Sequence, residues 1–485
     1  MSKDTINFVS EDNKKSLFPL KSTDRYIELG ADQLRNLIYK SIFDKSKQSD
    51  SFSTCPIVYA LKDNRHLRRM LFLDPIASFY IYDFLMRNSK LFQIDIKKRK
   101  RKYYGYALKN KKALSPFIQY HTFRKRKYEL KSEYRYFAKA DISNCFNSFY
   151  HHDVVSHIRS HLPEDEAIQF GQFLREINAG TSINCFPQGI YPAKSIGNNY
   201  LSFCESSFEL KSAAIIRFLD DFFFFDDNIS VIEQDIIVLQ QLLGARGLSL
   251  NEGKTKFGSK SSDFEEKKLD SIKKSLLAKR EETFSYDESQ EENVILDLEE
   301  VEYLKNILKS RDVAEEDVEL ALSLFEQDEE EAEVLIDIVF NRYPNLIKNL
   351  HKHMRDIEDD GELWSAIKKK IATDFLTEYE LFWLVRSIID IYTFDENSAE
   401  LLFAVFKHPC SSPIVKAAIL EFTDNRYGLE DLKLQQLRSG AEGIIASSAV
   451  AGLEKLERSK RNQNFKYISK SSQYLHTLCN IMSKV

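Results

Sequence analysis

The sequence predicts an α+β protein, a mixed α/β half followed by an all-α half. Glycine and proline are scarce, with 15 and 10 residues among 485, which is about half their usual share. This scarcity favours long helices and excludes an all-β sandwich or barrel. Strand-like runs of β-branched and aromatic residues are confined to roughly the first 260 residues. Beyond them one helical pattern follows another.

The domain organisation follows from these shifts in composition. Residues 1–260 carry the strand signals, residues 261–293 form a charged, Glu/Lys-rich linker, and residues 294–485 contain the helices. Pairs of such helices at loose intervals resemble a HEAT-like helical repeat domain. No apolar run approaches the ~20 residues of a membrane helix, and the N-terminal residues lack the apolar core of a secretory signal. We therefore expect a cytoplasmic protein with no membrane partner.

The net charge of −5 is the balance of two opposed blocks. Residues 61–140 contain 22 Lys/Arg against 6 Asp/Glu, whereas residues 281–340 contain 3 against 22. The basic block predicts a polyanionic partner, because Lys and Arg bind phosphates and its interleaved tyrosines can stack on bases. A solvated charged loop is the alternative. The acidic block predicts either a solvated helical surface or contact with the basic block of the same or another subunit.

Two adjacent carboxylates, Asp220 and Asp221, lie inside the apolar run RFLDDFFFF. A buried ionised carboxylate loses several kcal/mol of hydration unless it is paired or bound to a cation. A tight hairpin that holds both acids at its tip relieves this cost if a divalent cation binds there. A plain polar turn between two strands is the alternative.

A third acid, Asp141, ends the strand-like run YFAKAD. It either caps a following helix or joins the other two carboxylates. One strand-borne acid and one hairpin-borne pair form the set that phosphoryl transfer to a 3′-hydroxyl requires, with two Mg²⁺ ions about 3.5–4 Å apart. The three acids together favour a two-metal nucleotidyl-transfer site.

The segments FAKADISNCF, FPQGIYPAKSIGNNYL, RFLDDFFFF and GLSLNEGKTKF occur in the order and approximate spacing of reverse transcriptase palm motifs A, B, C and D. Upstream, RHLRRMLFLDPIASF resembles the fingers segment of that family. Motif C reads FLDD where the common form is YADD, and motif B lacks the usual Ser-Pro. The resemblance covers about 200 residues and implies a reverse transcriptase-like fingers and palm domain that uses Mg²⁺ and deoxynucleoside triphosphates.

The resemblance also implies a role for each matched residue. Asp141 and Asp220 would ligate both metals with the carbonyl of Ile142, and Asp221 would assist. Lys254 matches a lysine that donates a proton to pyrophosphate. The residues expected at the nucleotide are Arg65, Arg69 and Lys62 in the fingers, Phe146 as a steric gate against a ribose 2′-hydroxyl, and Gln188 and Gly189 beneath the nascent pair. The simpler alternatives are a core phenylalanine, a Pro-Gln-Gly turn and a solvated turn lysine.

An FLDD palm joined to a large helical half resembles the bacterial abortive-infection reverse transcriptases of the AbiA and AbiK type. This resemblance implies antiphage defence in the bacterial cytoplasm, homo-oligomers, and template-independent DNA synthesis primed by a protein hydroxyl, which leaves single-stranded DNA covalently attached. Two alternatives stay open: a templated RNA-directed DNA polymerase of another defence type, and a non-catalytic scaffold whose helical half binds a phage or host protein. The presence of all three acids argues against the scaffold.

Overall fold

The structure is a computed structural model, and it describes residues 3–44, 50–94, 100–180, 186–260, 296–310, 313–324, 329–355, 361–373 and 375–485, with part of 272–280. Most of the predicted linker 261–293 and part of the predicted acidic block lie outside the described residues. The chain forms two compact units. The first comprises Met1–Ser16, Leu34–Cys55 and Met70–Lys267; the second comprises Leu17–Gln33, Pro56–Arg69 and Lys268–Val485. The boundaries at residues 260 and 293 stay predictions.

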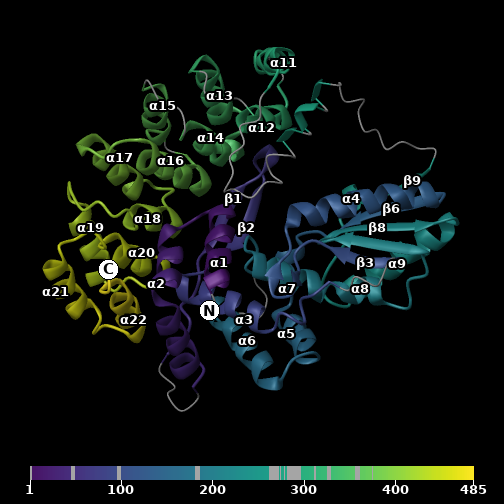
Figure 1. Ribbon diagram of the computed structural model, residues 1–485, viewed down its shortest axis with the longest axis horizontal. Helices are drawn as coiled ribbons and strands as arrows, with labels where there is room; N and C mark the ends of the chain where they lie inside the picture. Colours follow the sequence, from purple (N-terminus) through teal and green to yellow (C-terminus); the bar gives the residue numbers. More distant parts are fainter. Residues whose placement is uncertain are drawn as a thin grey trace. The chain divides into compact units, whose positions relative to one another are not determined.

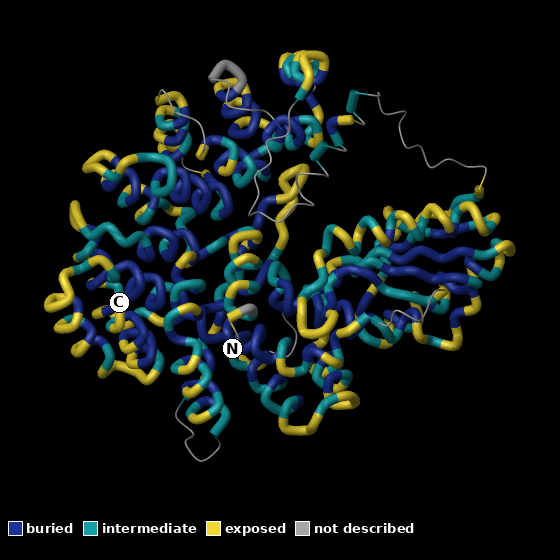
Figure 2. The backbone as a smooth tube through the Cα atoms, in the orientation of Figure 1, coloured by how far each residue is buried: buried dark blue, intermediate teal, exposed yellow. Residues whose placement is uncertain are grey.

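The first unit is built on a five-stranded mixed sheet in the order β3-β7-β8-β6-β9. Strand β3 runs parallel to β7, and the other neighbours are antiparallel. The central strands are buried (Figure 2) because their aromatic and β-branched residues suit a sheet covered on both faces. The strands are β3 (Arg101–Tyr104), β6 (Tyr136–Asp141), β7 (Ala214–Phe218), β8 (Asp221–Asp226) and β9 (Lys256–Ser259).

Helices cover both faces of this sheet. Helix α4 (Pro116–Glu133) contacts β3, β7 and β8 on one side, and α8 (Ser202–Ser206) and α9 (Ile229–Gly244) lie on the other (Figure 1). The remaining helices of the unit are α1 (Lys3–Lys15), α3 (Pro75–Arg87), α5 (His151–Arg159), α6 (Glu164–Ile177) and α7 (Tyr191–Tyr200). A short hairpin of β4 (Leu108–Lys109) and β5 (Lys112–Ala113) precedes α4.

A two-stranded sheet precedes helix α3 in the chain. Strands β1 (Ile57–Leu61) and β2 (Leu67–Leu71) form a two-stranded sheet. Helix α3 then begins at Pro75, because Pro is favoured at the first helical position and the Asp74 carboxylate accepts hydrogen bonds from the N–H groups of Ile76 and Ala77.

The described part of the second unit is largely helical, which confirms the predicted fold class. Helices α12, α14, α16, α18, α20 and α22 contact one another in succession, and each of α17, α19 and α21 packs against the helix that follows it. The HEAT-like character stays a prediction. These helices are α11 (Leu298–Leu308), α12 (Glu315–Leu324), α13 (Glu329–Asn341), α14 (Ile347–Met354), α15 (Glu362–Ile371), α16 (Glu378–Ile391), α17 (Glu396–Lys407), α18 (Pro413–Leu420), α19 (Leu429–Arg438), α20 (Gly443–Gly452), α21 (Arg458–Ile468) and α22 (Gln473–Met482).

An N-terminal segment completes the second unit. Helix α2 (Lys21–Leu37) begins in it, and the backbone N–H groups of Lys21 and Ser22 donate to the buried carboxylate of Glu421. Arg25 donates to Glu454 at 2.5 Å. These contacts join residues about 400 positions apart, so the helical unit is not made from C-terminal residues alone.

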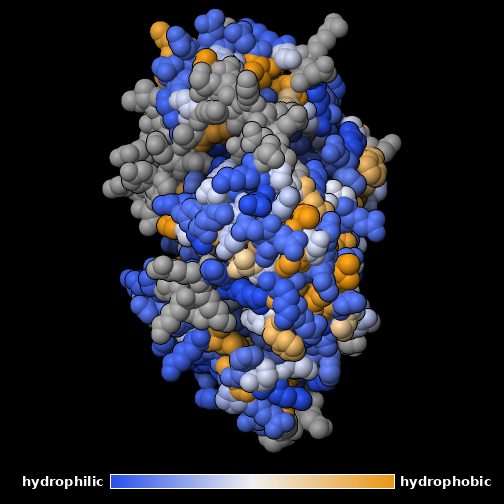
Figure 3. Space-filling model, turned by 90° about the vertical axis from the view of Figure 1, so that its right-hand side faces the viewer, coloured by the Kyte–Doolittle hydropathy of each residue, from blue (hydrophilic) through white to orange (hydrophobic). Residues whose placement is uncertain are grey.

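No described helix combines the length and apolar composition needed to cross a membrane. On the face shown in Figure 3, hydrophilic side chains predominate and apolar side chains are scattered among them. Scattered apolar side chains of this kind are normal on a surface in contact with water.

Candidate active site

A two-residue turn joins β7 to β8 and carries the predicted acid pair. Phe218 pairs with Asp221, so Leu219 and Asp220 occupy the turn. Leu219 has a φ of +53°, and a positive φ at the first central position of a tight hairpin turn usually belongs to glycine. A leucine there costs about 1–2 kcal/mol. The surrounding structure must therefore hold this turn in place.

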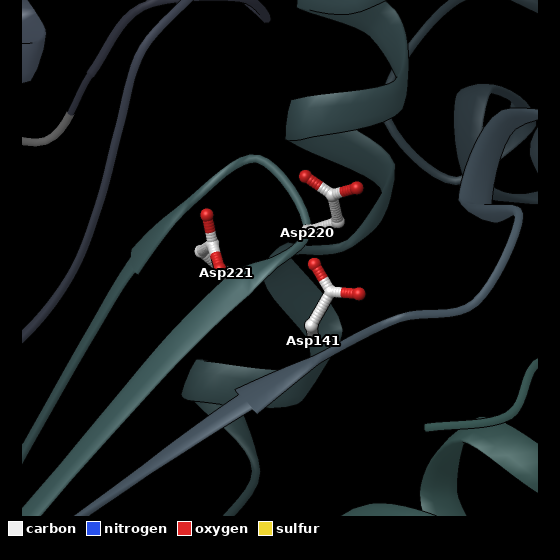
Figure 4. Close-up of side chains that lie close together, drawn as sticks. All are labelled: Asp141, Asp220 and Asp221. Carbon is white, nitrogen blue, oxygen red and sulfur yellow. The ribbon is translucent and has the colours of Figure 1, made fainter. Parts of the chain in front are cut away.

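The three predicted acids meet at the end of the sheet. Asp141 ends β6 and pairs in register with Asp221 at the start of β8, while Asp220 extends from the turn beside them (Figure 4). One carboxylate oxygen from each acid lies within 4.8 Å of the others. This all-oxygen set suits a hard divalent cation such as Mg²⁺. Ile142 is buried next to the acids, and its N–H donates to the carbonyl of Asp220 at 3.2 Å.

Two lysines contact the acids. The Nζ of Lys254 lies 3.3 Å from Asp141, and the Nζ of Lys139 lies 2.9 Å from Asp221. Burial, followed by the charges of Asp221 and Asp141, raises the pKa of Asp220 to about 6. A bound cation would stabilise the ionised form of Asp220 and offset the repulsion among the three carboxylates. The electrostatics of the site, as well as its oxygen ligands, therefore fit a divalent metal ion.

Comparison with known proteins accords with this geometry. Residues 87–303 match the family model of reverse transcriptase (RNA-dependent DNA polymerase). Over these residues, which make up less than half of the chain, the sequence is similar to a reverse transcriptase domain. The three acids lie inside the matched range.

Solved structures similar to the chain include two telomerases. Telomerase from Candida albicans, in complex with a fragment of telomeric RNA, is 11% identical with a TM-score of 0.32, and the match covers 80% of this chain and 65% of that one. Apo telomerase from Candida tropicalis is 10% identical with a TM-score of 0.33, and the match covers 93% and 74%. The chain thus spans about two thirds of the length of the first. A search of curated proteins finds no significant match.

Within the matched range, the structure also describes the predicted positions Phe146, Gln188 and Gly189. The segment of Phe146 joins the Pro-Gln-Gly turn, because Phe186 N–H donates to Phe146 carbonyl oxygen at 3.1 Å. Gly189 has a φ of +109°, and a Cβ added there would lie 2.5 Å from Met70. The positive φ favours glycine at that position, whereas the flexible end of the Met70 side chain could move away from a Cβ. Gln188, beside it, lies in the same turn.

The predicted fingers residues lie in the second unit. Lys62 and Arg65 lie at the connection between β1 and β2, and Arg69 lies within β2. Arg65 has a φ of +60° and lies outside both strands, so strand alternation does not determine its orientation relative to Arg69. The nucleotide contacts of these three residues stay predictions.

Sequence reasoning missed the group that holds the acid-bearing turn. Arg217 is fully buried, and all five of its N–H donors have acceptors. Two go to Glu205, two to the side chain and carbonyl of Asn198, and one to the carbonyl of Leu219 at 2.7 Å. The last bond fixes the strained residue directly before Asp220. The only available signal was an arginine in an apolar strand.

A second missed residue supports the Pro-Gln-Gly segment from a distance. Helix α7 follows that turn, and its first residue is Tyr191. The backbone N–H of Tyr191 donates to Asp12 of α1 at 2.7 Å, and the Tyr82 hydroxyl donates to the same oxygen. Burial raises the pKa of Asp12. Asp12 therefore caps a helix that begins 179 residues later.

Removing this cap should destabilise the protein. We expect Asp12→Ala to lower the free energy of unfolding by about 1–2 kcal/mol, because a buried N–H loses its acceptor. Asp12→Asn should keep most of the stability, since its amide oxygen can still accept. Urea denaturation measures both, with Glu11→Ala on the exposed side of the same helix as the control. Equal losses in the alanine and asparagine variants would contradict the capping role.

Proposed function

We propose that the chain is a Mg²⁺-dependent, deoxynucleotide-polymerising enzyme of antiphage abortive-infection defence, in which template-independent DNA synthesis starts from a hydroxyl of the protein itself. The single observation that carries the enzymatic part is the cluster of Asp141, Asp220 and Asp221 within a matched reverse transcriptase domain. The defence role rests on the resemblance of the FLDD motif and the helical half to the abortive-infection type.

In this proposal Asp141, Asp220 and Asp221 hold two Mg²⁺ ions, with the Ile142 carbonyl as a further ligand. When bound, such ions activate an attacking hydroxyl and neutralise the charge of the leaving pyrophosphate. The side chain of Lys254, 3.3 Å from Asp141 and largely exposed, is placed to give a proton to a departing phosphate oxygen. Phe146 would exclude a ribose 2′-hydroxyl, which selects deoxynucleotides.

The wider parts of the proposal concern partners. Product DNA would be single-stranded and covalently attached to the protein, the active form would be a homo-oligomer in the bacterial cytoplasm, and the helical half would bind a phage or host protein. Dissociation of the oligomer by high salt would support assembly through the opposed acidic and basic blocks.

The test is incubation of purified protein with Mg²⁺ and labelled deoxynucleotides, without template or primer, followed by a denaturing gel with and without protease. Label that migrates with the protein until protease treatment, and is absent from Asp220→Ala, is the expected result. Incorporation that begins only when RNA template and primer are added would replace this proposal with the templated RNA-directed polymerase, which the description of the matched family favours.

A further inference from the structure

Helix α4 covers the same face of the sheet that carries two of the acids. The register pairs Asp141 with Asp221, Lys139 with Phe223, and Phe137 with Phe225, and side chains paired across neighbouring strands share one face. Residues Phe123 and Leu130 of α4 pack into the core on this face, against Phe137, Phe223 and Phe225. Helix α4 therefore lies along the sheet (Figure 1), on the face that carries Asp141 and Asp221.

Three lysines lie beside aromatic rings of this face, and we refer to Lys131, Lys127 and Lys139 as the lysine ladder. The Nζ of Lys131 lies 4.4 Å from the ring centre of Phe137. The Nζ groups of Lys127 and Lys139 lie 5.4 and 5.9 Å from the ring centre of Phe223, and that of Lys139 also lies 2.9 Å from Asp221. Lys131 thus lies beside Phe137, whereas Lys127 and Lys139 both lie beside Phe223, which is nearer to the acids along the sheet.

Helix α4 also carries two acids. Both acids of the helix, Glu129 and Glu133, accept hydrogen bonds from Arg126 at 2.8 and 3.1 Å. An exposed aromatic ring lies beside the ladder. The side chain of Tyr128 is 40% exposed, and the Nζ of Lys127 lies 4.9 Å from its ring centre. Cations that follow a backbone, combined with exposed rings that stack on bases, are the features of proteins that bind single-stranded nucleic acid.

We propose that the lysine ladder and Tyr128 bind the single strand that the carboxylate site extends, with the phosphates on the lysines and a base on the ring. This proposal rests on the polymerase function proposed above and names the strand's path. One row of cations matches one backbone, and an exposed ring can stack only on a base that is not already enclosed in a duplex. The occupant is therefore single-stranded DNA rather than a template–primer duplex.

The test measures the binding of a fluorescein-labelled oligodeoxythymidylate by anisotropy over a range of NaCl concentrations, with EDTA and without nucleotides. Gln in place of both Lys127 and Lys131 should weaken binding about tenfold near physiological salt, and should reduce the slope of log Kd against log salt by about 1.4, because each lost phosphate contact removes about 0.7. Tyr128→Ala should weaken binding about tenfold with little change in slope.

The matched control replaces Lys125 and Lys112 by Gln, because both are exposed, lie off the ladder and remove the same charge. The proposal would be overturned if the slope of log Kd against log salt fell as much in the control as in the ladder variant. It would also be overturned by a ladder variant that folds normally by circular dichroism and binds the oligonucleotide like wild type. If the slope of log Kd against log salt for a labelled duplex falls by the same amount in the ladder variant, the single-strand assignment is overturned. Since no nucleotide is present, a protein that fails to polymerise but shows the ladder-specific loss refutes only the proposed function.

Discussion

Asn in place of Asp220 is expected to stabilise the metal-free protein by about 3 kcal/mol at pH 7.5 and to abolish nucleotide incorporation. Burial and the charges of Asp221 and Asp141 raise the pKa of Asp220 from 3.8 to about 6. Ionisation of Asp220 therefore costs the folded state free energy, about 1.4 kcal/mol for each unit of the shift. Asn removes this cost because it carries no charge.

The pH dependence follows from the direction of the shift. Below pH 3.8 the carboxyl group is protonated in both states and contributes nothing to stability. As the pH rises from 3.8 to about 6 the unfolded state loses the proton first, so wild type loses stability, and above about pH 6 the loss is complete. The advantage of Asp220→Asn should accordingly be full at pH 7.5 and should vanish near pH 4.

Activity should change in the opposite direction. In the proposed function Asp220 is a metal ligand, and the loss of such a ligand removes several kcal/mol of transition-state stabilisation, so incorporation should fall at least about a thousandfold. Urea denaturation in EDTA and then in Mg²⁺ measures the stability side, with the exposed Glu209→Gln as the control. Mg²⁺ should stabilise wild type and leave the variant almost unchanged. A variant that is less stable than wild type in EDTA would contradict the account of the site.

The three acids that the structure brings together could be singled out from the sequence because the signal is local. Asp141, Asp220 and Asp221 each follow or interrupt an apolar strand-forming run, where an acid needs a specific reason to occur. The structure places their oxygens within 4.8 Å of one another. Their roles in metal binding and catalysis stay predictions, as do those of Lys254, Phe146 and Gln188.

The supporting groups were not predictable, because each depends on contacts between distant residues. Asp12 reads as one more acid in a polar helix, and only the fold brings it to Tyr191. Glu205 and Arg217 lie on different elements and meet only when the sheet and α8 pack. The assignment of residues 17–33 to the helical unit likewise depends on contacts such as that between Ser22 and Glu421. Periodicity and turn residues carry no information on such pairings.

The second large effect concerns the buried ion pair behind the acid-bearing turn. Glu205→Gln should lower the free energy of unfolding by about 3 kcal/mol, because Arg217 stays charged and fully buried with only part of its acceptors. Denaturation in urea measures this loss. The exposed pair of Arg126 and Glu129 supplies the control, since Glu129→Gln should cost at most about 1 kcal/mol.

A double variant separates stability from the positioning of the turn. Arg217→Met combined with Glu205→Leu replaces the ion pair by apolar groups and should recover most of the stability lost in Glu205→Gln, because a buried pair gains little over well-packed apolar side chains. It also removes the hydrogen bond from Arg217 to the Leu219 carbonyl, which holds the strained residue before Asp220. Incorporation by the double variant should therefore stay about 10–100-fold below wild type. If activity returned together with stability, the ion pair would serve only to stabilise the fold, and the turn would hold its geometry through the pairing of β7 with β8.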